Sequence, residues 1–250
     1  MQTAVERAIE TMWHRYPEPL TLAELADAAI LSRFYFSRIF RAATGTSPGR
    51  FLMAVRLYQA KRLLLATSRS VTDISYQVGY NSLGTFTSRF TSGVGVSPAR
   101  YRHLSGCGMP GVREPSRRDD ASGTVHGSIR LPDTGQHTRI YVGVFENLIA
   151  QGRPRAWGVV DTGDTYRLPG VPEGSWFVHA VAVATEDLDP RPWLRRPLLV
   201  NGRPAIRVSP GQSCRVDLDL RPSGTVDLPV LLALPELDGR TRSELALAGR

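Results

Sequence analysis

Within the first hundred residues of the chain, one pattern of residues occurs twice, fifty positions apart. The recurring residues are those that begin, end or bury helices: Ser32, Phe36, Phe40, Gly45, Ser47, Pro48, Arg50 and Phe51 return as Ser82, Phe86, Phe90, Gly95, Ser97, Pro98, Arg100 and Tyr101. Serine favours the position just before a helix, proline its first turn and glycine the position after its end. The repeat therefore predicts two similar helical modules in tandem.

Seven helices are expected between residues 3 and 104. The amphipathic stretch 3–16 ends before Pro17, because proline cannot continue a helix. Thr21 followed by Glu24 is a capping box that begins a second helix. The remaining helices are expected after Ser32, Ser47, Ser70, Ser82 and Ser97. In each module, two short helices separated by a tight turn have the pattern of a helix-turn-helix.

The composition changes after residue 104. Residues 105–122 are rich in Gly, Pro, Arg and Asp and indicate a solvated linker. From residue 123 to 235, short apolar stretches with a period of two alternate with turn residues, which predicts an all-β sandwich domain. Strands are expected at 124–130, 138–145, 155–160, 164–168, 175–184, 197–200, 205–208, 213–220 and 225–231. Residues 236–250 form a polar tail, so the fold class is multi-domain: an all-α tandem helix-turn-helix domain over 1–104, then an all-β sandwich.

The positive charge is concentrated in the repeated half. Residues 1–104 contain 13 Lys or Arg and 6 Asp or Glu, whereas residues 105–250 contain 18 and 17. This excess favours a polyanionic partner such as double-stranded DNA, although a basic, merely soluble surface would have the same composition. The chain has no apolar stretch of membrane-spanning length, and its two cysteines have no ligand-like spacing. We expect a soluble cytoplasmic protein without a membrane partner.

A helical wheel divides the third helix into two faces. Phe36, Ile39, Phe40 and Ala43 are expected to pack inward, and the outer face contains Phe34, Ser37, Arg38 and Arg41. An arginine, a hydroxyl and an aromatic ring suit a guanine edge, a polar contact and a thymine methyl group in the major groove. The alternative is an ordinary solvated helix surface. The turn, the caps and the repetition favour the groove-reading hypothesis.

The sixth helix has the same inner aromatics but an uncharged outer face. Its expected outward residues are Gly84, Thr87, Ser88 and Thr91, with Arg89 at the border. Sequence discrimination should therefore depend more on the first module. A long fourth helix would hold the two reading helices roughly 34 Å apart, so that one chain reads an asymmetric site of about 20 bp. The cations Arg50, Arg56, Lys61 and Arg62 are either phosphate contacts or solvated charges.

These stretches resemble the DNA-binding domain of AraC/XylS-type transcription regulators over residues 10–104. The match lies in LAELADAAILSRFYFSRIFRAATGTSPGRFLMAVRLYQAKRLL and VTDISYQVGYNSLGTFTSRFTSGVGVSPARYR. The resemblance implies a sequence-specific regulator, usually an activator that contacts RNA polymerase. It assigns base reading to the third and sixth helices, which by position means Arg33, Phe34, Ser37, Arg38, Leu83, Gly84, Thr87 and Ser88.

The chain departs from that family in two respects. Ser88 stands where the family commonly has arginine, with Arg89 one place later. The family also usually places its sensing domain before the DNA-binding domain, so its effector logic does not transfer. The second domain more weakly resembles the prealbumin-like sandwich of transthyretin and carboxypeptidase regulatory-like domains, through GTVHGSIRLPDTG and YRLPGVPEGSWFVHAVAVA. That resemblance implies an interaction module and leaves open a homodimer, a small molecule or a protein partner.

The motifs do not favour an enzyme. The five histidines, His14, His103, His126, His137 and His179, have neither metal-ligand spacing nor a neighbouring nucleophile motif. We therefore expect no catalytic residue, no cofactor and no metal. The rival hypothesis is an adaptor whose helical half binds DNA loosely and whose sandwich recruits a protein. Salt dependence separates the two, because loose phosphate binding weakens alike on every duplex.

Overall fold

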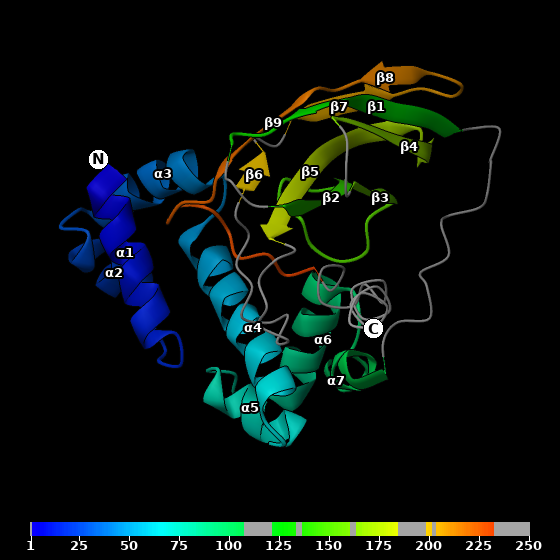
Figure 1. The fold of residues 1–250 in the computed structure, drawn as a ribbon. Coiled ribbons are helices and arrows are strands. Elements are labelled where there is room, and N and C mark those ends of the chain that lie inside the picture. The colour runs from blue at the N-terminus through cyan, green and yellow to red at the C-terminus, as the bar shows by residue number, and fades with distance from the viewer. Residues whose placement is uncertain are drawn as a thin grey trace. The chain divides into compact units, whose positions relative to one another are not determined.

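The computed structural model describes residues 2–107, 122–133, 137–160, 164–184, 199–201 and 204–232 (Figure 1). Most of the expected linker and the whole polar tail lie outside these residues. The chain forms two compact units. The helical unit comprises Met1–Arg102 together with Gly224–Leu231, and the β-unit lies within His103–Ser223. The expected order, helices followed by strands, is confirmed.

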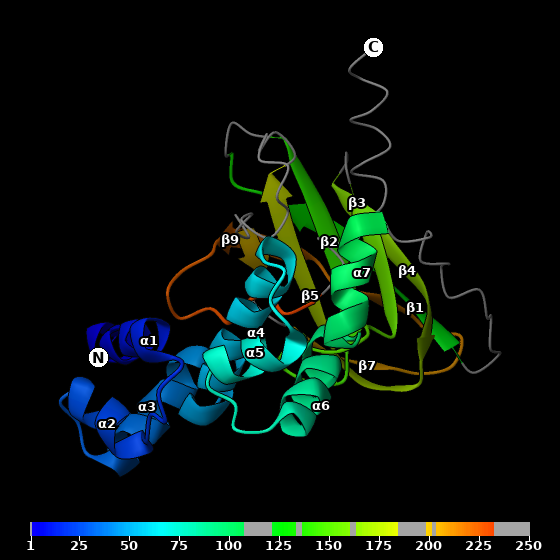
Figure 2. The same cartoon turned by 90° about the horizontal axis from the view of Figure 1, so that it is seen from below.

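Seven helices occur in the described part of the chain, as the capping pattern predicts. They are α1 (Gln2–Arg15), α2 (Leu22–Ala28), α3 (Arg33–Thr44), α4 (Pro48–Ala66), α5 (Val71–Gln77), α6 (Leu83–Val94) and α7 (Pro98–Cys107). The long α4 runs between the group α1–α3 and the pair α5 and α6 (Figure 2). None of the described helices is both long and apolar enough to cross a membrane.

The sequence-predicted caps form most of the helix ends. Thr21 and Glu24 make the reciprocal capping box of α2. The Ser70 hydroxyl accepts a hydrogen bond from the Asp73 amide at 3.0 Å, and Ser47, Ser82 and Ser97 accept longer ones. Ser32 is the N-cap of α3, as expected, and has extended backbone, but its side chain makes no cap hydrogen bond. Gly45 and Gly95 end α3 and α6 in the left-handed conformation.

The repeat in the sequence becomes a repeat in the core. Three fully buried aromatic side chains in each module pack ring against ring: Phe36, Phe40 and Phe51 in the first, and Phe86, Phe90 and Tyr101 in the second. Successive ring centroids lie 5.4 and 5.6 Å apart in the first series and 5.6 and 5.7 Å apart in the second. Each series ties the second helix of a helix-turn-helix to the helix that follows it.

The β-unit contains nine described strands. They are β1 (Ser122–Arg130), β2 (Thr138–Phe145), β3 (Ala156–Val160), β4 (Thr165–Pro172), β5 (Gly174–Ala184), β6 (Leu199–Asn201), β7 (Ala205–Val208), β8 (Ser213–Arg215) and β9 (Leu218–Pro222). Their order is β3-β2-β5-β6-β9-β1-β4, with β7 beside β5 and β8 beside β1. Most neighbours are antiparallel, and β1 pairs in parallel with β8 and β9.

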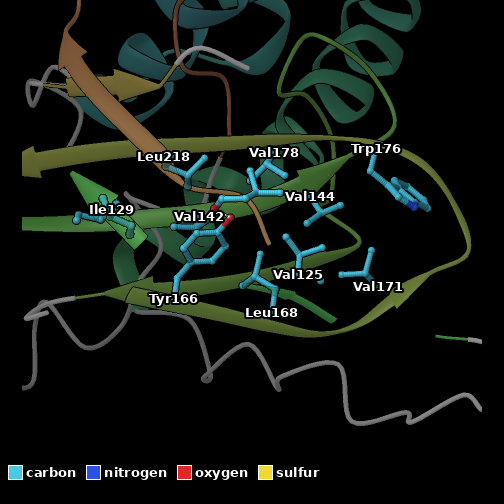
Figure 3. Close-up of a cluster of buried hydrophobic side chains, with 14 of the residues drawn as sticks. Val125, Ile129, Val142, Val144, Tyr166, Leu168, Val171, Trp176, Val178 and Leu218 are labelled. Atoms are coloured by element: carbon cyan, nitrogen blue, oxygen red, sulfur yellow. Dashed lines mark hydrogen bonds between the residues drawn. The ribbon is translucent and has the colours of Figure 1, made fainter. Parts of the chain in front are cut away.

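The core of the β-unit is a cluster of alternate side chains from facing strands (Figure 3). Val125 of β1 and Leu168 of β4 point toward Val142 and Val144 of β2. The Tyr166 hydroxyl donates to the Val216 carbonyl at 2.8 Å, and burial raises the pKa of this phenol. Such inward alternation is what a period of two predicts for strands with one buried face.

Two strand predictions are wrong. Residues 213–220 form two strands, β8 and β9, because the chain leaves the ladder at Val216, whose amide donates to the His126 carbonyl at 2.8 Å. Residues 225–231 form no strand and belong to the helical unit. Leu231 is buried, and Val226 and Leu228 are partly buried against the helical core. The apolar pattern therefore predicts packing correctly but assigns it to the wrong partner.

Candidate nucleic-acid interface

The outer face of α3 presents the predicted reading residues. Arg33, Phe34, Arg38 and Arg41 are exposed, and Ser37 is half-buried. The Phe34 ring is 90% exposed, an unusual state for an aromatic side chain of this size. Exposure of a ring among three guanidinium groups creates a cationic surface with an apolar element.

One inward assignment on α3 is wrong. Ala43 is exposed, and the neighbouring Thr44 is buried in its place. The Thr44 hydroxyl donates to the Phe40 carbonyl at 2.9 Å, which satisfies its polar group inside the helical core. Threonine is polar, so a helical wheel does not place it in the core, but this local hydrogen bond allows Thr44 to be buried.

The Arg38 guanidinium is positioned by a neighbouring ring. Its central carbon lies 5.1 Å from the centroid of the Tyr35 ring, within the range of a cation–π contact. Arg38 is nevertheless exposed, so its donors face solvent. Such a contact already restricts the long side chain, so that less conformational entropy is lost when it binds a ligand. Among the α3 cations, Arg38 is therefore favoured as a directed hydrogen-bond donor.

The outer face of α6 is hollowed and uncharged. A shallow depression in the surface is lined by Leu83, Gly84, Thr87, Ser88, Thr91 and Ser92. Four of these are predicted reading residues, so the structure brings them together on one surface. Arg89 is exposed but does not line the depression, and its charge acts on the buried phenol of Tyr80. Burial is the main reason that the pKa of Tyr80 is raised.

Two of the four flanking cations have structural roles. The Arg56 side chain donates to the Tyr16 and Glu18 carbonyls, each at 2.7 Å, and holds the loop before α2. Burial lowers the pKa of this guanidinium. Lys61 is only 2% exposed. Arg50 is exposed and Arg62 is half-buried, so these two stay candidates for phosphate contacts.

The second module has an equivalent of Arg56 that the sequence analysis missed. Arg102 donates to the Leu64 carbonyl at 3.0 Å and to the Arg69 carbonyl at 2.6 Å, and so holds the loop before α5. In both modules, an arginine on the helix that follows the helix-turn-helix holds the loop that precedes it. No fixed spacing marks this pair in the sequence, because Arg56 and Arg102 are not fifty positions apart.

The turn between the two helices differs between the modules. The first turn spans residues 29–32 and the second 78–82, so the second is one residue longer. Ile30 and Gly79 have positive φ angles of 59° and 86°. Their amides donate equivalent bonds to the carbonyls of Asp27 and Tyr76. A β-branched residue is strained in this conformation, and the Ile30 side chain is 74% exposed.

Comparison with protein families identifies the helical part. Residues 25–103 match the model of a helix-turn-helix domain. Among curated proteins, the chain is 31% identical over 99 residues to the lactose operon transcription activator of Staphylococcus xylosus, covering 40% of this chain and 36% of that protein. It is 32% identical over 117 residues to the right origin-binding protein of Escherichia coli K12, covering 47% and 40%.

Solved structures give the same likeness over the same share of the chain. The DNA-binding domain of AdpA, solved with a target DNA, is 30% identical with a TM-score of 0.40, covering 41% of this chain and 93% of that one. An AraC-type regulator from Chromobacterium violaceum is 28% identical with a TM-score of 0.38, covering 41% and 92%. The chain spans 36 to 40% of the length of the two curated relatives named above.

Proposed function

We propose that the protein is a sequence-specific transcription regulator that reads an asymmetric DNA site with α3 and α6. The outer face of α3 carries the proposal, because Phe34 and three arginines are exposed together on the second helix of a helix-turn-helix. Arginine donates to guanine, an apolar ring contacts thymine, and the remaining cations balance phosphates. The transcription regulators among the relatives support the same function.

The proposed readers are Arg33, Phe34, Ser37, Arg38 and Arg41 on α3 and Leu83, Gly84, Thr87, Ser88 and Arg89 on α6. The two faces differ in chemistry, so they are assigned different parts of the site. The α3 face suits a guanine-containing segment. The uncharged depression on α6 suits close contact with sugars, phosphates and thymine methyl groups through hydroxyls and small side chains.

The β-unit is proposed to be a prealbumin-like sandwich that serves as an interaction module. Its alternating core and short strands support that assignment. The proposed partners of the whole protein are double-stranded DNA and RNA polymerase, with a homodimer, a small molecule or a second protein at the β-unit.

Selection from random duplexes tests the proposal. The full chain should enrich one asymmetric motif of about 20 bp, as two reading helices in successive major grooves require. A salt titration then compares the selected duplex with a scrambled one. At physiological salt the selected duplex should bind at least about 10³-fold more tightly, the lower end for specific complexes. Equal affinities that decline in parallel with salt would favour the adaptor with loose DNA binding.

A further inference from the structure

The helical unit contains a segment that lies more than a hundred residues beyond its last helix. Residues Gly224–Leu231 follow β9 in the chain but are part of the helical unit (Figure 1, orange). The segment begins with a turn in which the Gly224 amide donates to the Asp227 carboxylate at 2.8 Å and the Asp227 amide donates to the Gly224 carbonyl at 3.1 Å. We call Gly224–Leu231 the clasp.

The first half of the clasp packs on the first module. Val226 and Leu228 lie against the buried cluster that α1, α2, α3 and the start of α4 share. That cluster contains Phe40 and Phe51, the same rings that position α3. The clasp is therefore in contact with the core that supports the α3 reading face.

The second half reaches α4 and the second module. The Lys61 ammonium on α4 donates to the Val230 carbonyl at 3.3 Å and lies 5.7 Å from the centroid of the Tyr101 ring. Leu231 is 1% exposed, and its side chain lies beside Gly93 of α6, where an added Cβ would be 3.5 Å from it. The clasp thus contacts the helix that bears the second reading face.

The contacts of the clasp have opposing energetic consequences. Burial of Leu231 and partial burial of Val226 and Leu228 favour attachment. Lys61, the only lysine of the chain, is buried, and a buried ammonium must give up water for protein acceptors. Detachment would return this charge to water while exposing the three apolar side chains.

We propose that the clasp ties both helix-turn-helix modules to α4, and that the β-unit influences DNA reading through it. The second part rests on the proposed function. If the two reading helices are held at a fixed separation, binding of the second helix to DNA is intramolecular once the first is bound. This second step then costs the protein little conformational entropy. A detached clasp leaves the helices to be ordered on binding, which lowers the affinity for a complete site.

Acetylation of the single lysine measures the state of the clasp directly. The full chain is treated with an amine-reactive acetylating reagent, and peptide mass spectrometry follows Lys61 separately from the N-terminal amine. In the folded chain Lys61 should react at least ten-fold more slowly than in the urea-unfolded chain. The double variant Val226→Asp and Leu228→Asp should regain most of the unfolded rate. The control Thr225→Asp, on an exposed neighbour, should stay as slow as the unchanged protein.

Two acetylation results would contradict the proposal that the clasp is attached to the helices. One is a Lys61 rate in the folded chain equal to the unfolded rate. The other is a double variant that keeps its helical circular dichroism yet protects Lys61 fully. If the double variant does not fold, Leu231→Ala replaces it, because this change shortens one buried side chain without adding charge. Leu231→Ala should raise the Lys61 rate several-fold, and an unchanged rate would contradict the proposal.

Binding measurements with the same variants test the influence on DNA. For the duplex selected by the full chain, the double variant should bind about ten-fold more weakly, while a duplex that keeps only the half read by α3 should bind within two-fold of normal. Equal losses on both duplexes, or no loss on either, would overturn the coupling. If the full chain selects no sequence at all, the proposed function fails, and the Lys61 rates still decide whether the clasp exists.

Discussion

The two helix-turn-helix modules share a core and differ at the surface. Their aromatic series occupy positions fifty residues apart, and the separations of corresponding ring centroids agree within 0.2 Å. Their outer faces have little in common. The α3 face exposes three arginines and a phenylalanine, whereas the depression on α6 is lined by small, hydroxyl-bearing and apolar residues. The interior of a duplicated unit is constrained by packing, and its surface is free to specialise.

The turns of the two modules show the same contrast at a single position. Gly79 occupies a left-handed position where an added Cβ would lie 2.6 Å from the Pro17 carbonyl oxygen. Ile30 makes the equivalent turn with a side chain in open solvent. The second module needs glycine for both conformation and space, whereas the first accepts a strained residue because nothing crowds it.

The largest expected effect concerns the shared core. Phe40→Ala and Phe90→Ala should each lower the free energy of unfolding by about 3–5 kcal/mol, since both rings are fully buried. The two losses should agree within about 1 kcal/mol if the modules are equivalent inside. Chemical denaturation followed by circular dichroism measures both. Phe34→Ala, on the exposed ring, is the control and should change stability by less than about 0.5 kcal/mol. A large difference between the two core variants would break the comparison.

The turns should respond to substitution with opposite signs. Gly79→Ala should destabilise the protein by at least about 1–2 kcal/mol, the cost of a left-handed residue, because contact with Pro17 adds to it. Ile30→Gly should stabilise it by up to about 1 kcal/mol, because the strain disappears and no buried contact is lost. Thermal and urea unfolding of the full chain give both values. Destabilisation by Ile30→Gly would mean that Ile30 supports the fold in a way its exposure conceals.

The reading faces should contribute unequally to DNA affinity. Arg38→Ala should weaken binding to the selected duplex by about 1–3 kcal/mol and relax the preference at one position. Ser88→Ala should cost less, because it removes a hydroxyl without a formal charge. Affinities at a fixed salt concentration test this, with scrambled duplex as the reference. Equal losses for the two variants would show that the two faces contribute equally to DNA affinity despite their different chemistry.

The smallest effect concerns the cap of the first module. Hydrogen bonds from Thr21 lower the pKa of Glu24, with Arg15 adding to the effect. A carboxyl with a lowered folded pKa stabilises the protein above its unfolded pKa of about 4.3 and loses that contribution as the pH falls below it. The stability difference between the unchanged protein and Glu24→Gln should therefore shrink between about pH 6 and pH 3. Urea denaturation across this range measures it, and a constant difference would exclude the charge as the cause.

The sequence by itself determines the local elements. Helix bounds follow from Thr21, Ser47, Pro48 and the glycines after α3 and α6, because caps and left-handed ends depend on neighbouring residues only. Strand positions follow from the alternation of apolar residues. The outward position of Phe34, Arg38 and Arg41 also follows from helical periodicity. These features are local, so a sequence pattern contains their physical cause.

Only the tertiary structure decides which surfaces meet. The apolar stretch 225–231 predicts burial, but its packing on helices rather than strands depends on contacts across more than 160 residues, such as that between Lys61 and Val230. Arg56 and Arg102 look like solvated cations until the carbonyls they hold are seen. The hydrophobic effect is non-directional, so an apolar segment can be buried equally well against helices or strands. Only the long-range packing of the folded chain determines which of them it contacts.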